Sequence, residues 1–289
     1  MTISPLVFRD RFSDLASAYD VVLSDVWGVV HNGVAALPEA GEALAHFRKG
    51  GGTVVLISNA PRPGKQVIHF LDHLKVIREA YDGIVTSGDV TVAVVAARPG
   101  QTLFHVGPER DHSIFAGLDV TFAPLETADY VVCSGLFDDE TETAEDYREL
   151  LGRMRTRGLF MVCANPDVVV ERGDRLVYCA GAIADLYKTM GGEVLYAGKP
   201  YRPIYDQALA EAESAHGKAT PLARVLAIGD SVRTDVAGAA TLGVDCLFLT
   251  AGIHAEELGG RDTPDPAVLR TIFAGANVAP KAVMRRLVW

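Results

Sequence analysis

The sequence has little cysteine, and its cysteines form no recognisable pattern. The four cysteines are Cys133, Cys163, Cys179 and Cys246, and they contain no CxxC pair. Zinc sites and disulfide frameworks need closely or regularly spaced cysteines, which this chain lacks. We therefore expect reduced thiols that act as small core residues in a reducing compartment.

The sequence also lacks basic clusters and long apolar runs. It has 27 Lys and Arg against 37 Asp and Glu, a net charge of −10, with no basic tract of five or more residues. This balance disfavours binding to nucleic acid or to an anionic membrane surface, while one lysine and a metal ion could still hold a small anion. No run approaches the length of a membrane span, and the charges in MTISPLVFRDRF come too early for a secretory signal. We expect a cytoplasmic protein.

What is present indicates a core with a large insertion. A chain of 289 residues, 49% of them apolar, is long for one domain. Short apolar runs alternate with helical segments over residues 21–97, which is typical of a doubly wound parallel sheet. The alternation breaks at Arg98-Pro99-Gly100, and a second β/α series follows. We predict an α/β fold with a Rossmann-like core, residues 1–99 and 196–289, and an inserted α/β domain, residues 100–195. Helical spacing also predicts a helix over residues 5–20.

Four short motifs place chemically active side chains at predicted strand ends or in loops. They are Asp25 in DVWGV, Ser58 in ISNAP, Lys199 in GKP, and Asp230 and Asp235 in GDSVRTD. Open parallel sheets bind ligands at the carboxyl ends of their strands. Each residue alone has a simpler interpretation, such as a turn acid, a helix cap or a solvated lysine. Together they supply a carboxylate nucleophile, a hydroxyl, a cation and carboxylates for a divalent metal, which is the set that phosphoryl transfer needs.

The order DVWGV, ISNAP, GKP, GDSVRTD resembles the haloacid dehalogenase-like hydrolase superfamily. The long insertion between ISNAP and GKP resembles the cap domain of its class IIA, the NagD-type and p-nitrophenyl phosphatase-like branch. CANPD at residues 163–167 is similar to the cap loop that faces the active site in that class. The resemblance covers roughly residues 20–255. It implies a Mg²⁺-dependent phosphatase that acts on a small phosphorylated metabolite, such as a sugar phosphate or a nucleotide.

The resemblance also assigns roles to single residues. The implied metal ligands are Asp25, the carbonyl of Trp27, Asp230 and Asp235. Asp25 would also be the nucleophile, Ser58 would bind a phosphoryl oxygen, and Lys199 would steady Asp25 and the phosphate. The implied substrate-binding residues are Gly28, Asn59, Arg62 and Asn165. Capped enzymes of this class are often dimers, so a homodimer through the cap is a further expectation.

Trp27 departs from the family pattern. Phosphatases of the superfamily normally carry a second Asp at this position, which protonates the leaving group and later activates water. An indole cannot do this near neutral pH, and general acid–base help is typically worth about 10²–10⁴ in rate. The loss matters most for alkyl phosphates, whose leaving groups need a proton. His31 is the nearest replacement in sequence, although a loop histidine is the simpler interpretation; His105, His112 and Asp167 of the insertion are other candidates.

Three functions remain open from the sequence. A Mg²⁺-dependent phosphatase is favoured. A catalytically weak or inactive regulatory protein that binds phosphate and metal would explain Trp27, but it would not explain why Asp25, Lys199 and Asp230 are all retained. Hydrolysis of a carbon–halogen bond is the third, because dehalogenases of the superfamily carry an aromatic residue at this position. The carboxylates of GDSVRTD disfavour it, since a dehalogenase needs no metal.

Overall fold

A computed structural model describes residues 6–172, 175–255, 257–260 and 264–289. The chain divides into two compact units. The first, here called the core unit, comprises Met1–Ser58, Ile68–Val85 and Tyr205–Trp289, apart from the gaps just given. The second, the cap unit, comprises Asn59–Val67 and Thr86–Ile204. Both units contain a mainly parallel sheet, so the predicted α/β class is confirmed.

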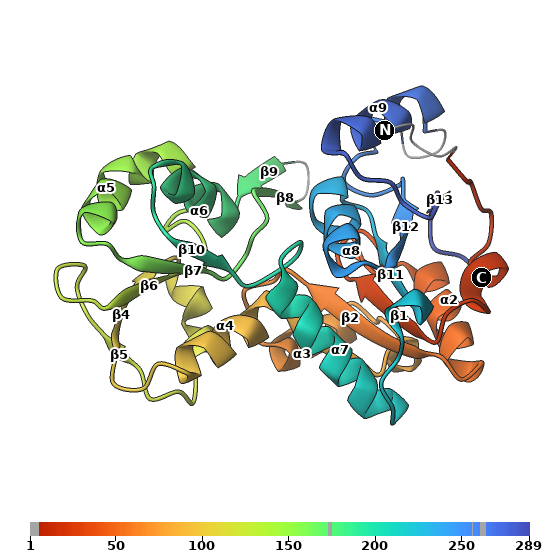
Figure 1. The fold of residues 1–289 in the computed structure, drawn as a ribbon, viewed down its shortest axis with the longest axis horizontal. Coiled ribbons are helices and arrows are strands. Elements are labelled where there is room, and N and C mark those ends of the chain that lie inside the picture. Colours follow the sequence, from red (N-terminus) through yellow and green to blue (C-terminus); the bar gives the residue numbers. More distant parts are fainter. Residues whose placement is uncertain (1–5, 173–174, 256, 261–263) are drawn as a thin grey trace. The chain divides into compact units, whose positions relative to one another are not determined.

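The sheet of the core unit has the strand order β13-β12-β11-β1-β2-β3 (Figure 1). Its strands are β1 (Val21–Asp25), β2 (Thr53–Ser58), β3 (Gly83–Thr86), β11 (Val225–Gly229), β12 (Asp245–Leu249) and β13 (Ala282–Met284). The described registers of β1 with β2 and β11, and of β12 with β11 and β13, are parallel. From β1 the next strands, β2 and β3, are added on one side of the sheet, and from β11 the next strands, β12 and β13, are added on the other side. This reversal is the Rossmann arrangement, in which ligands bind beyond the carboxyl ends of the strands on either side of the reversal, here β1 and β11.

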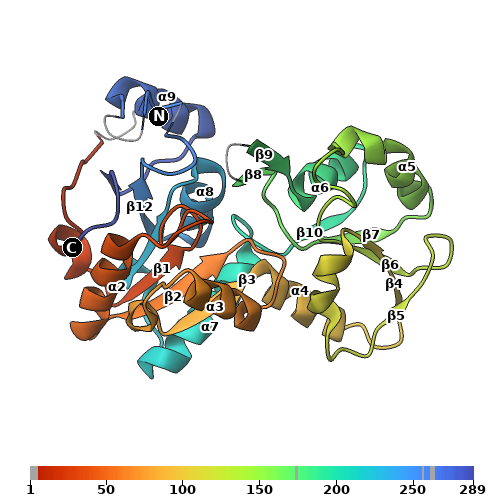
Figure 2. The ribbon, with the colours of Figure 1, turned by 180° about the vertical axis from the view of Figure 1, so that it is seen from behind.

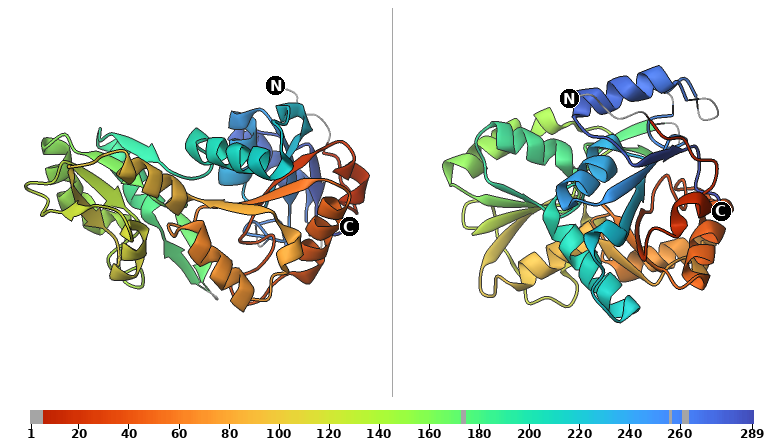
Figure 3. Two further views of the ribbon diagram at one scale, coloured as in Figure 1. Left: turned by 90° about the horizontal axis from the view of Figure 1, so that it is seen from below. Right: turned by 45° about the vertical axis from the view of Figure 1, so that its right-hand side comes forward.

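Helices cover both faces of this sheet, which is why its central strands are continuous apolar runs with every residue of β2 and β11 buried. The helical elements are α2 (Pro38–Lys49), α3 (Gly64–His73), η1 (Arg78–Ala80), α7 (Arg202–His216), η4 (Leu222–Arg224), the π-helix η5 (Val232–Val236), α8 (Ala237–Leu242) and α9 (Pro266–Ala276). The left view of Figure 3 shows α7 and α3 on opposite sides of the sheet. Among the helices the structure describes, none is long and apolar enough to cross a membrane.

The helix predicted over residues 5–20 is wrong for the described part of that segment; residue 5 lies outside it. A single turn, α1 (Ser13–Ala16), is helical. Before it the chain is extended, with a parallel bridge between Phe8 and Val283 and a bond from the Arg9 amide to the Val283 carbonyl, 2.9 Å. Leu6 packs against the apolar cluster that contains Val283 of the edge strand β13. The extended segment thus lies beside this edge, where pairing satisfies backbone groups.

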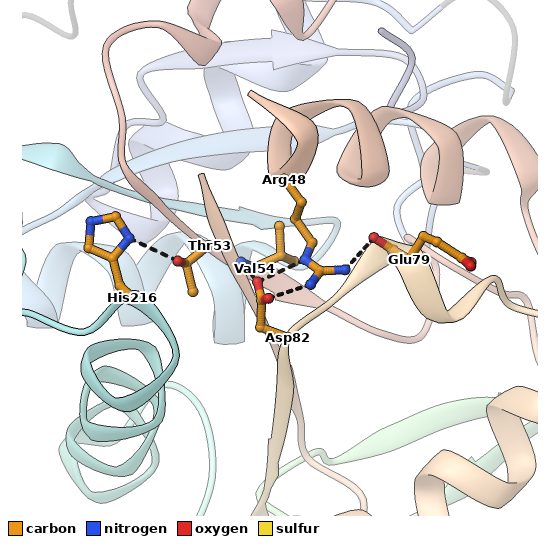
Figure 4. A network of polar contacts seen from close by, with 6 residues as sticks. All are labelled: Arg48, Thr53, Val54, Glu79, Asp82 and His216. Atoms are coloured by element: carbon orange, nitrogen blue, oxygen red, sulfur yellow. Dashed lines mark hydrogen bonds and ion pairs between the residues drawn. The ribbon is translucent and has the colours of Figure 1, made fainter. Parts of the chain in front are cut away.

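A polar network ties α2 to the amino-terminal edge of the core sheet (Figure 4). The Asp82 carboxylate accepts bonds from Arg48 Nε at 2.9 Å, from Arg48 Nη2, and from the Val54 amide at 2.8 Å. Thr53 Oγ1 lies 3.0 Å from Nδ1 of His216, at the end of α7. These contacts hold the edge opposite the carboxyl ends of the strands, so we interpret them as stabilising the fold.

The cap unit contains a sheet of order β10-β7-β6-β4-β5, whose described pairs are all parallel. Its strands are β4 (Thr102–Val106), β5 (Thr121–Phe122), β6 (Tyr130–Cys133), β7 (Phe160–Cys163) and β10 (Val194–Tyr196), with an antiparallel hairpin of β8 (Val169–Arg172) and β9 (Arg175–Tyr178). Its helical elements are α4 (Ser87–Ala96), η2 (Glu109–Phe115), η3 (Ala144–Tyr147), α5 (Arg148–Thr156) and α6 (Ala180–Thr189). Figure 2 shows α4 on the opposite side of this sheet from α5 and α6.

The cysteines behave as the sequence predicts. All four are buried thiols outside any disulfide. Burial raises the pKa of the Cys133 thiol to about 12, and it raises that of Cys163 well above the usual range. Because the thiolate is the reactive form, these thiols are chemically inert core residues.

Candidate functional site

Three carboxylates meet at the carboxyl edge of the core sheet. Asp25 is the last residue of β1, Asp230 follows β11 directly, and Asp235 lies in η5. One oxygen of each carboxylate lies within 4.8 Å of the other two. Asp230 and Asp235 are 5% and 3% exposed, while Asp25 is half-buried. The structure thus gathers the three side chains expected to bind metal, because β1 and β11 are neighbours at the reversal of strand order.

Backbone amides orient each of these carboxylates. Asp25 Oδ1 accepts a hydrogen bond from the amide of Val26 at 2.7 Å. Asp235 Oδ2 accepts one from Ser231 at 3.1 Å, and Asp230 Oδ2 accepts one from Ile253 at 2.9 Å. Hydrogen bonds to ionised acceptors are stronger than neutral ones, so these amides fix the carboxylates in place before any ligand binds.

Three glycines leave room for the two buried carboxylates. A Cβ at Gly28, where φ is +82°, would lie 2.0 Å from Asp230 Oδ2, and a Cβ at Gly252 would lie 1.9 Å from the same oxygen. At Gly229 a Cβ would lie 2.1 Å from the Asp235 Cγ. Gly28, expected from the sequence to bind substrate, therefore packs against Asp230. Gly252 belongs to none of the four motifs, and its role becomes visible only when β12 is placed beside β11.

The donor set fits a hard divalent cation. Mg²⁺ takes oxygen ligands at about 2.0–2.1 Å in octahedral geometry, so two opposite ligands are roughly 4 Å apart. Three buried or half-buried carboxylates within 4.8 Å of one another can meet that requirement. The cluster is therefore an acidic site that can hold a metal ion.

Ser58 lies at the same edge of the sheet. It is the last residue of β2 and is 8% exposed. Asp25 pairs in register with Ile57, so Ser58 stands one residue beyond the level of Asp25 on the neighbouring strand. A hydroxyl therefore stands at the same edge as the carboxylates, and its role in binding a phosphoryl oxygen stays a prediction.

Trp27 follows β1, and its side chain is 40% exposed. Its ring packs edge-on against the His31 ring, with 5.1 Å between centroids. A Cβ at Gly33 would lie 2.4 Å from the indole, so glycine is needed there. The indole is thus held in a defined position by the turn after β1, but it supplies no group that titrates near neutral pH.

His31 is buried within the turn that follows β1. The residue is 2% exposed, and its Nδ1 accepts a hydrogen bond from the Gly33 amide at 2.8 Å. Burial lowers the pKa of His31 to about 4, so the ring is neutral at pH 7. Its ring also contacts Phe70, with centroids 5.5 Å apart. These contacts support the simpler interpretation of a packed histidine within the turn.

The remaining predicted site residues belong to the cap unit. They are Asn59, Arg62, Asn165 and Lys199. Lys199, Asn59 and Asn165 are buried, at 3%, 5% and 8% exposure. The Asn165 side chain accepts a hydrogen bond from the amide of Asp167 at 3.0 Å, and the Arg62 carbonyl accepts one from Thr86 Oγ1 at 2.7 Å. The loop after β2 and the loop of Asn165-Pro166-Asp167, here called the NPD loop, are therefore both anchored by hydrogen bonds within this unit.

The other histidines considered as replacements for the acid form a separate cluster in the cap unit. His105 Nε2 lies 2.9 Å from Ser134 Oγ, and the rings of His105 and His112 are 5.1 Å apart. Burial, with a smaller effect of His112, lowers the pKa of His105 to about 4. Asp167, the third cap candidate, accepts a hydrogen bond from Asn59 at 2.9 Å.

Comparisons with known proteins agree with this architecture. Residues 22–121 match the haloacid dehalogenase-like hydrolase family, and residues 196–275 match the HAD-hydrolase-like family. A hydrolase of the haloacid dehalogenase-like family from Brucella suis 1330 is 46% identical, covers 97% of this chain and 100% of its own, and superposes with a TM-score of 0.85.

Two more distant structures share the fold. A possible sugar phosphatase of the HAD superfamily from Cytophaga hutchinsonii is 17% identical over 98% of this chain and 99% of its own, with a TM-score of 0.76. A p-nitrophenyl phosphatase from Archaeoglobus fulgidus is 21% identical over 92% of this chain and 95% of its own, with a TM-score of 0.71. No curated protein matches the chain significantly.

Proposed function

Because this chain belongs to the haloacid dehalogenase-like hydrolase family, as its motifs predict, we propose that it is a Mg²⁺-dependent phosphatase with Asp25 as nucleophile. The observation that carries the proposal is the group of Asp25, Asp230 and Asp235, with carboxylate oxygens within 4.8 Å of one another at the switch point of the core sheet. The two distant relatives described as phosphatases support phosphate chemistry over carbon–halogen hydrolysis.

In this proposal the three carboxylates and the Trp27 carbonyl hold the metal ion. Bound Mg²⁺ would offset the negative charge of the phosphoryl oxygens. An oxygen of Asp25 attacks phosphorus while the bond from phosphorus to the leaving-group oxygen breaks, and that oxygen keeps the electron pair. Water then attacks the aspartyl-phosphate, the bond between Asp25 and phosphorus breaks, and orthophosphate is released. Ser58 donates to a phosphoryl oxygen, and Lys199 offsets its charge.

Trp27 directs the choice of substrate in this mechanism. Neither its indole nor the neutral, buried His31 can protonate a departing alkoxide at pH 7. Leaving groups that are weak bases depart without that proton. We therefore propose that aryl phosphates, acyl phosphates and phosphoanhydrides react faster than alkyl phosphates. The proposed natural substrate is a small phosphorylated metabolite such as a sugar phosphate or a nucleotide, and any of these that departs as an alkoxide would be hydrolysed slowly.

The domain roles complete the proposal. Residues 1–99 and 196–289 would form the catalytic core in the cytoplasm, and the insertion of residues 100–195 would act as the cap that selects the leaving group. The compact cap unit is larger than this insertion, because it also includes residues 59–67, 86–99 and 196–204. Arg62 and Asn165 would contact the substrate, and a homodimer would form through the cap.

A second candidate is a regulatory protein that binds metal and phosphate without turnover. The observation that favours it is again Trp27, since the turn after β1 presents no acid at that position. This candidate keeps the carboxylate cluster and the phosphate-binding residues but predicts no release of phosphate.

The test is phosphate release from p-nitrophenyl phosphate and from acetyl phosphate, with Mg²⁺ or with EDTA. The wild type is compared with Asp25→Asn and with Asp119→Asn, a control at an exposed cap position. We expect Mg²⁺-dependent release that EDTA stops and that Asp25→Asn abolishes, because a neutral amide is a poor nucleophile. Full activity in Asp25→Asn would refute the covalent mechanism. No release from the wild type, with Mg²⁺ and orthophosphate still bound in calorimetry, would establish the regulatory candidate.

A further inference from the structure

We propose that Asn59 is a positioning residue whose side-chain amide clamps the backbone of Lys199, and that it does not bind substrate through that amide. The proposal rests on the phosphatase function for the role of Lys199. It revises the expectation from the sequence, which places Asn59 among the substrate-binding residues.

The amide of Asn59 pairs with both backbone groups of Lys199. The Lys199 amide donates to Asn59 Oδ1 at 2.7 Å, and Asn59 Nδ2 donates to the Lys199 carbonyl at 3.1 Å. The side chain thus makes the same two bonds that a neighbouring strand would make. Asn59 and Lys199 are 5% and 3% exposed, so water cannot readily replace a lost bond. A buried polar group that loses its hydrogen-bond partner destabilises the folded state, which makes the clamp specific.

The rest of the Asn59 amide is also engaged. Nδ2 donates to Asp167 Oδ1 at 2.9 Å, and Ser87 Oγ donates weakly to Oδ1 at 3.5 Å. An amide has two N–H donors and a carbonyl with two lone pairs. Both donors are used by Lys199 and Asp167, and both lone pairs of Oδ1 face donors. The side chain therefore retains no hydrogen-bonding capacity for a substrate.

Asp167 is itself held firmly, so the clamp has a fixed support. Its carbonyl accepts a bond from the Gly181 amide at 3.1 Å, and its amide donates to Asn165 Oδ1 at 3.0 Å. A Cβ at Gly181 would lie 2.3 Å from the Pro166 carbonyl oxygen, so α6 begins in direct contact with the NPD loop. The loop that carries Asp167 is therefore packed against a helix.

The residue before Lys199 leaves space for the clamp. A Cβ at Gly198 would lie 2.0 Å from Ser87 Oγ and 2.3 Å from Asn59 Oδ1. Glycine at this position lets the GKP backbone approach the Asn59 amide closely enough to pair with it. Asn59 and Gly198 thus act together, although they are far apart in the sequence.

This arrangement explains how a lysine can be placed accurately. The ammonium group stands at the end of a flexible four-carbon chain, so fixing its backbone is the first condition for a defined position. A misplacement of 1 Å at a reacting centre can cost about 10² in rate. The clamp lets Lys199 meet the phosphate without rearrangement of its own loop.

The experiment compares Asn59→Asp with the wild type in two measurements: the rate of exchange of the Lys199 backbone amide, and kcat and KM for p-nitrophenyl phosphate with Mg²⁺. The introduced carboxylate keeps one acceptor for the Lys199 amide but turns its other oxygen toward the Lys199 carbonyl and Asp167, where it is repelled. We expect faster exchange of the Lys199 amide and a fall of about 100-fold in kcat/KM that includes kcat. Adding the second substitution Asp167→Asn supplies a donor to the introduced carboxylate. The double variant should therefore have a kcat/KM at least fivefold higher than that of Asn59→Asp.

Controls separate this role from a general loss of structure. Asn277→Asp, at an exposed helix end, should leave exchange and kinetics unchanged. If Asn59→Asp fails to fold, Asp167→Ala tests the same clamp, with an expected loss of about tenfold in kcat/KM and faster exchange of the Lys199 amide, which a role of Asp167 in proton transfer alone would not produce. Unchanged exchange of the Lys199 amide with a rise in KM alone would overturn the proposal and restore a substrate-binding role. A wild type without phosphatase activity would overturn the proposed function, and the exchange rate alone would then decide whether the clamp exists.

Discussion

Glycine at position 28 could be needed for two reasons: it leaves space for the Asp230 carboxylate, and it allows a positive φ. The substitution Gly28→Ala, with a suitable control, distinguishes the two. Gly28 has a φ of +82°, and its added Cβ would lie 2.0 Å from Asp230 Oδ2. Gly243 has nearly the same φ, +83°, but nothing within 4 Å of the added Cβ. Gly243→Ala is therefore a matched control that carries the conformational strain without the contact with the carboxylate.

The two variants should share one effect and differ in another. An L-residue in the left-handed region costs roughly 1–2 kcal/mol, so both should lose a similar free energy of unfolding. At position 28 the carboxylate must also retreat by about 1.4 Å to reach an ordinary contact of 3.4 Å. This breaks the hydrogen bond from the Ile253 amide to Asp230, 2.9 Å long in the wild type. Metal sites tolerate displacements of about 0.2 Å, so Mg²⁺ affinity should fall by about 100-fold or more.

The assay is a Mg²⁺ titration of p-nitrophenyl phosphate hydrolysis, supported by calorimetric binding of Mg²⁺ and by chemical unfolding of both variants. We expect the Mg²⁺ concentration for half-maximal activity to rise about 100-fold in Gly28→Ala and to stay within twofold in Gly243→Ala. Equal Mg²⁺ dependence in the two variants would refute the reasoning, because it would mean that Asp230 does not need the space that Gly28 leaves.

Other predictions test the remaining parts of the structure. Trp27→Asp should raise kcat/KM for an alkyl phosphate at least tenfold more than for p-nitrophenyl phosphate, since the new acid protonates the poorer leaving group; equal gains for both substrates would show that protonation is not what Trp27 lacks. The pKa of His105 is lowered to about 4, so the neutral ring stabilises the fold fully above pH 6.5, and this stability is lost as the pH falls from 6.5 through 4. In urea titrations the free energy of unfolding should therefore fall less between pH 7 and 4.5 in His105→Gln than in the wild type, by up to about 2 kcal/mol. The same pH dependence in both proteins would contradict a lowered pKa of His105. Arg48→Met should lower the free energy of unfolding by about 1–2 kcal/mol, because Arg48 binds the partly buried Asp82 with two nitrogens. Arg148→Met should lower it by less than about 0.5 kcal/mol, because Arg148 and its partner Glu145 are 55% and 66% exposed. Equal melting temperatures for these two variants would count against a stabilising role of the Arg48 network.

The sequence was most informative where structure is local or where motifs are ordered along the chain. The strand at residues 130–133 coincides with an apolar run in the sequence. The helix at residues 38–49 begins at Pro38 and ends before the glycines that follow Lys49, so local sequence accounts for its bounds. The family also followed from motif order and is confirmed. The prediction of a helix over residues 5–20 was wrong, because apolar residues at helical spacing can also occur in an extended segment beside a sheet edge.

For the candidate site, the motifs were enough to predict which carboxylates meet. Asp25 ends one short buried strand and Asp230 follows another, and parallel strands bring their carboxyl ends to one edge. How each side chain is used depends on contacts that form only in the folded chain. The tertiary structure placed Gly252 against Asp230, buried His31 as a neutral ring, and paired Asn59 with Lys199 across 140 residues of chain. The physical reason is that burial and hydrogen-bond partners depend on segments that are distant in sequence, and no local pattern contains them.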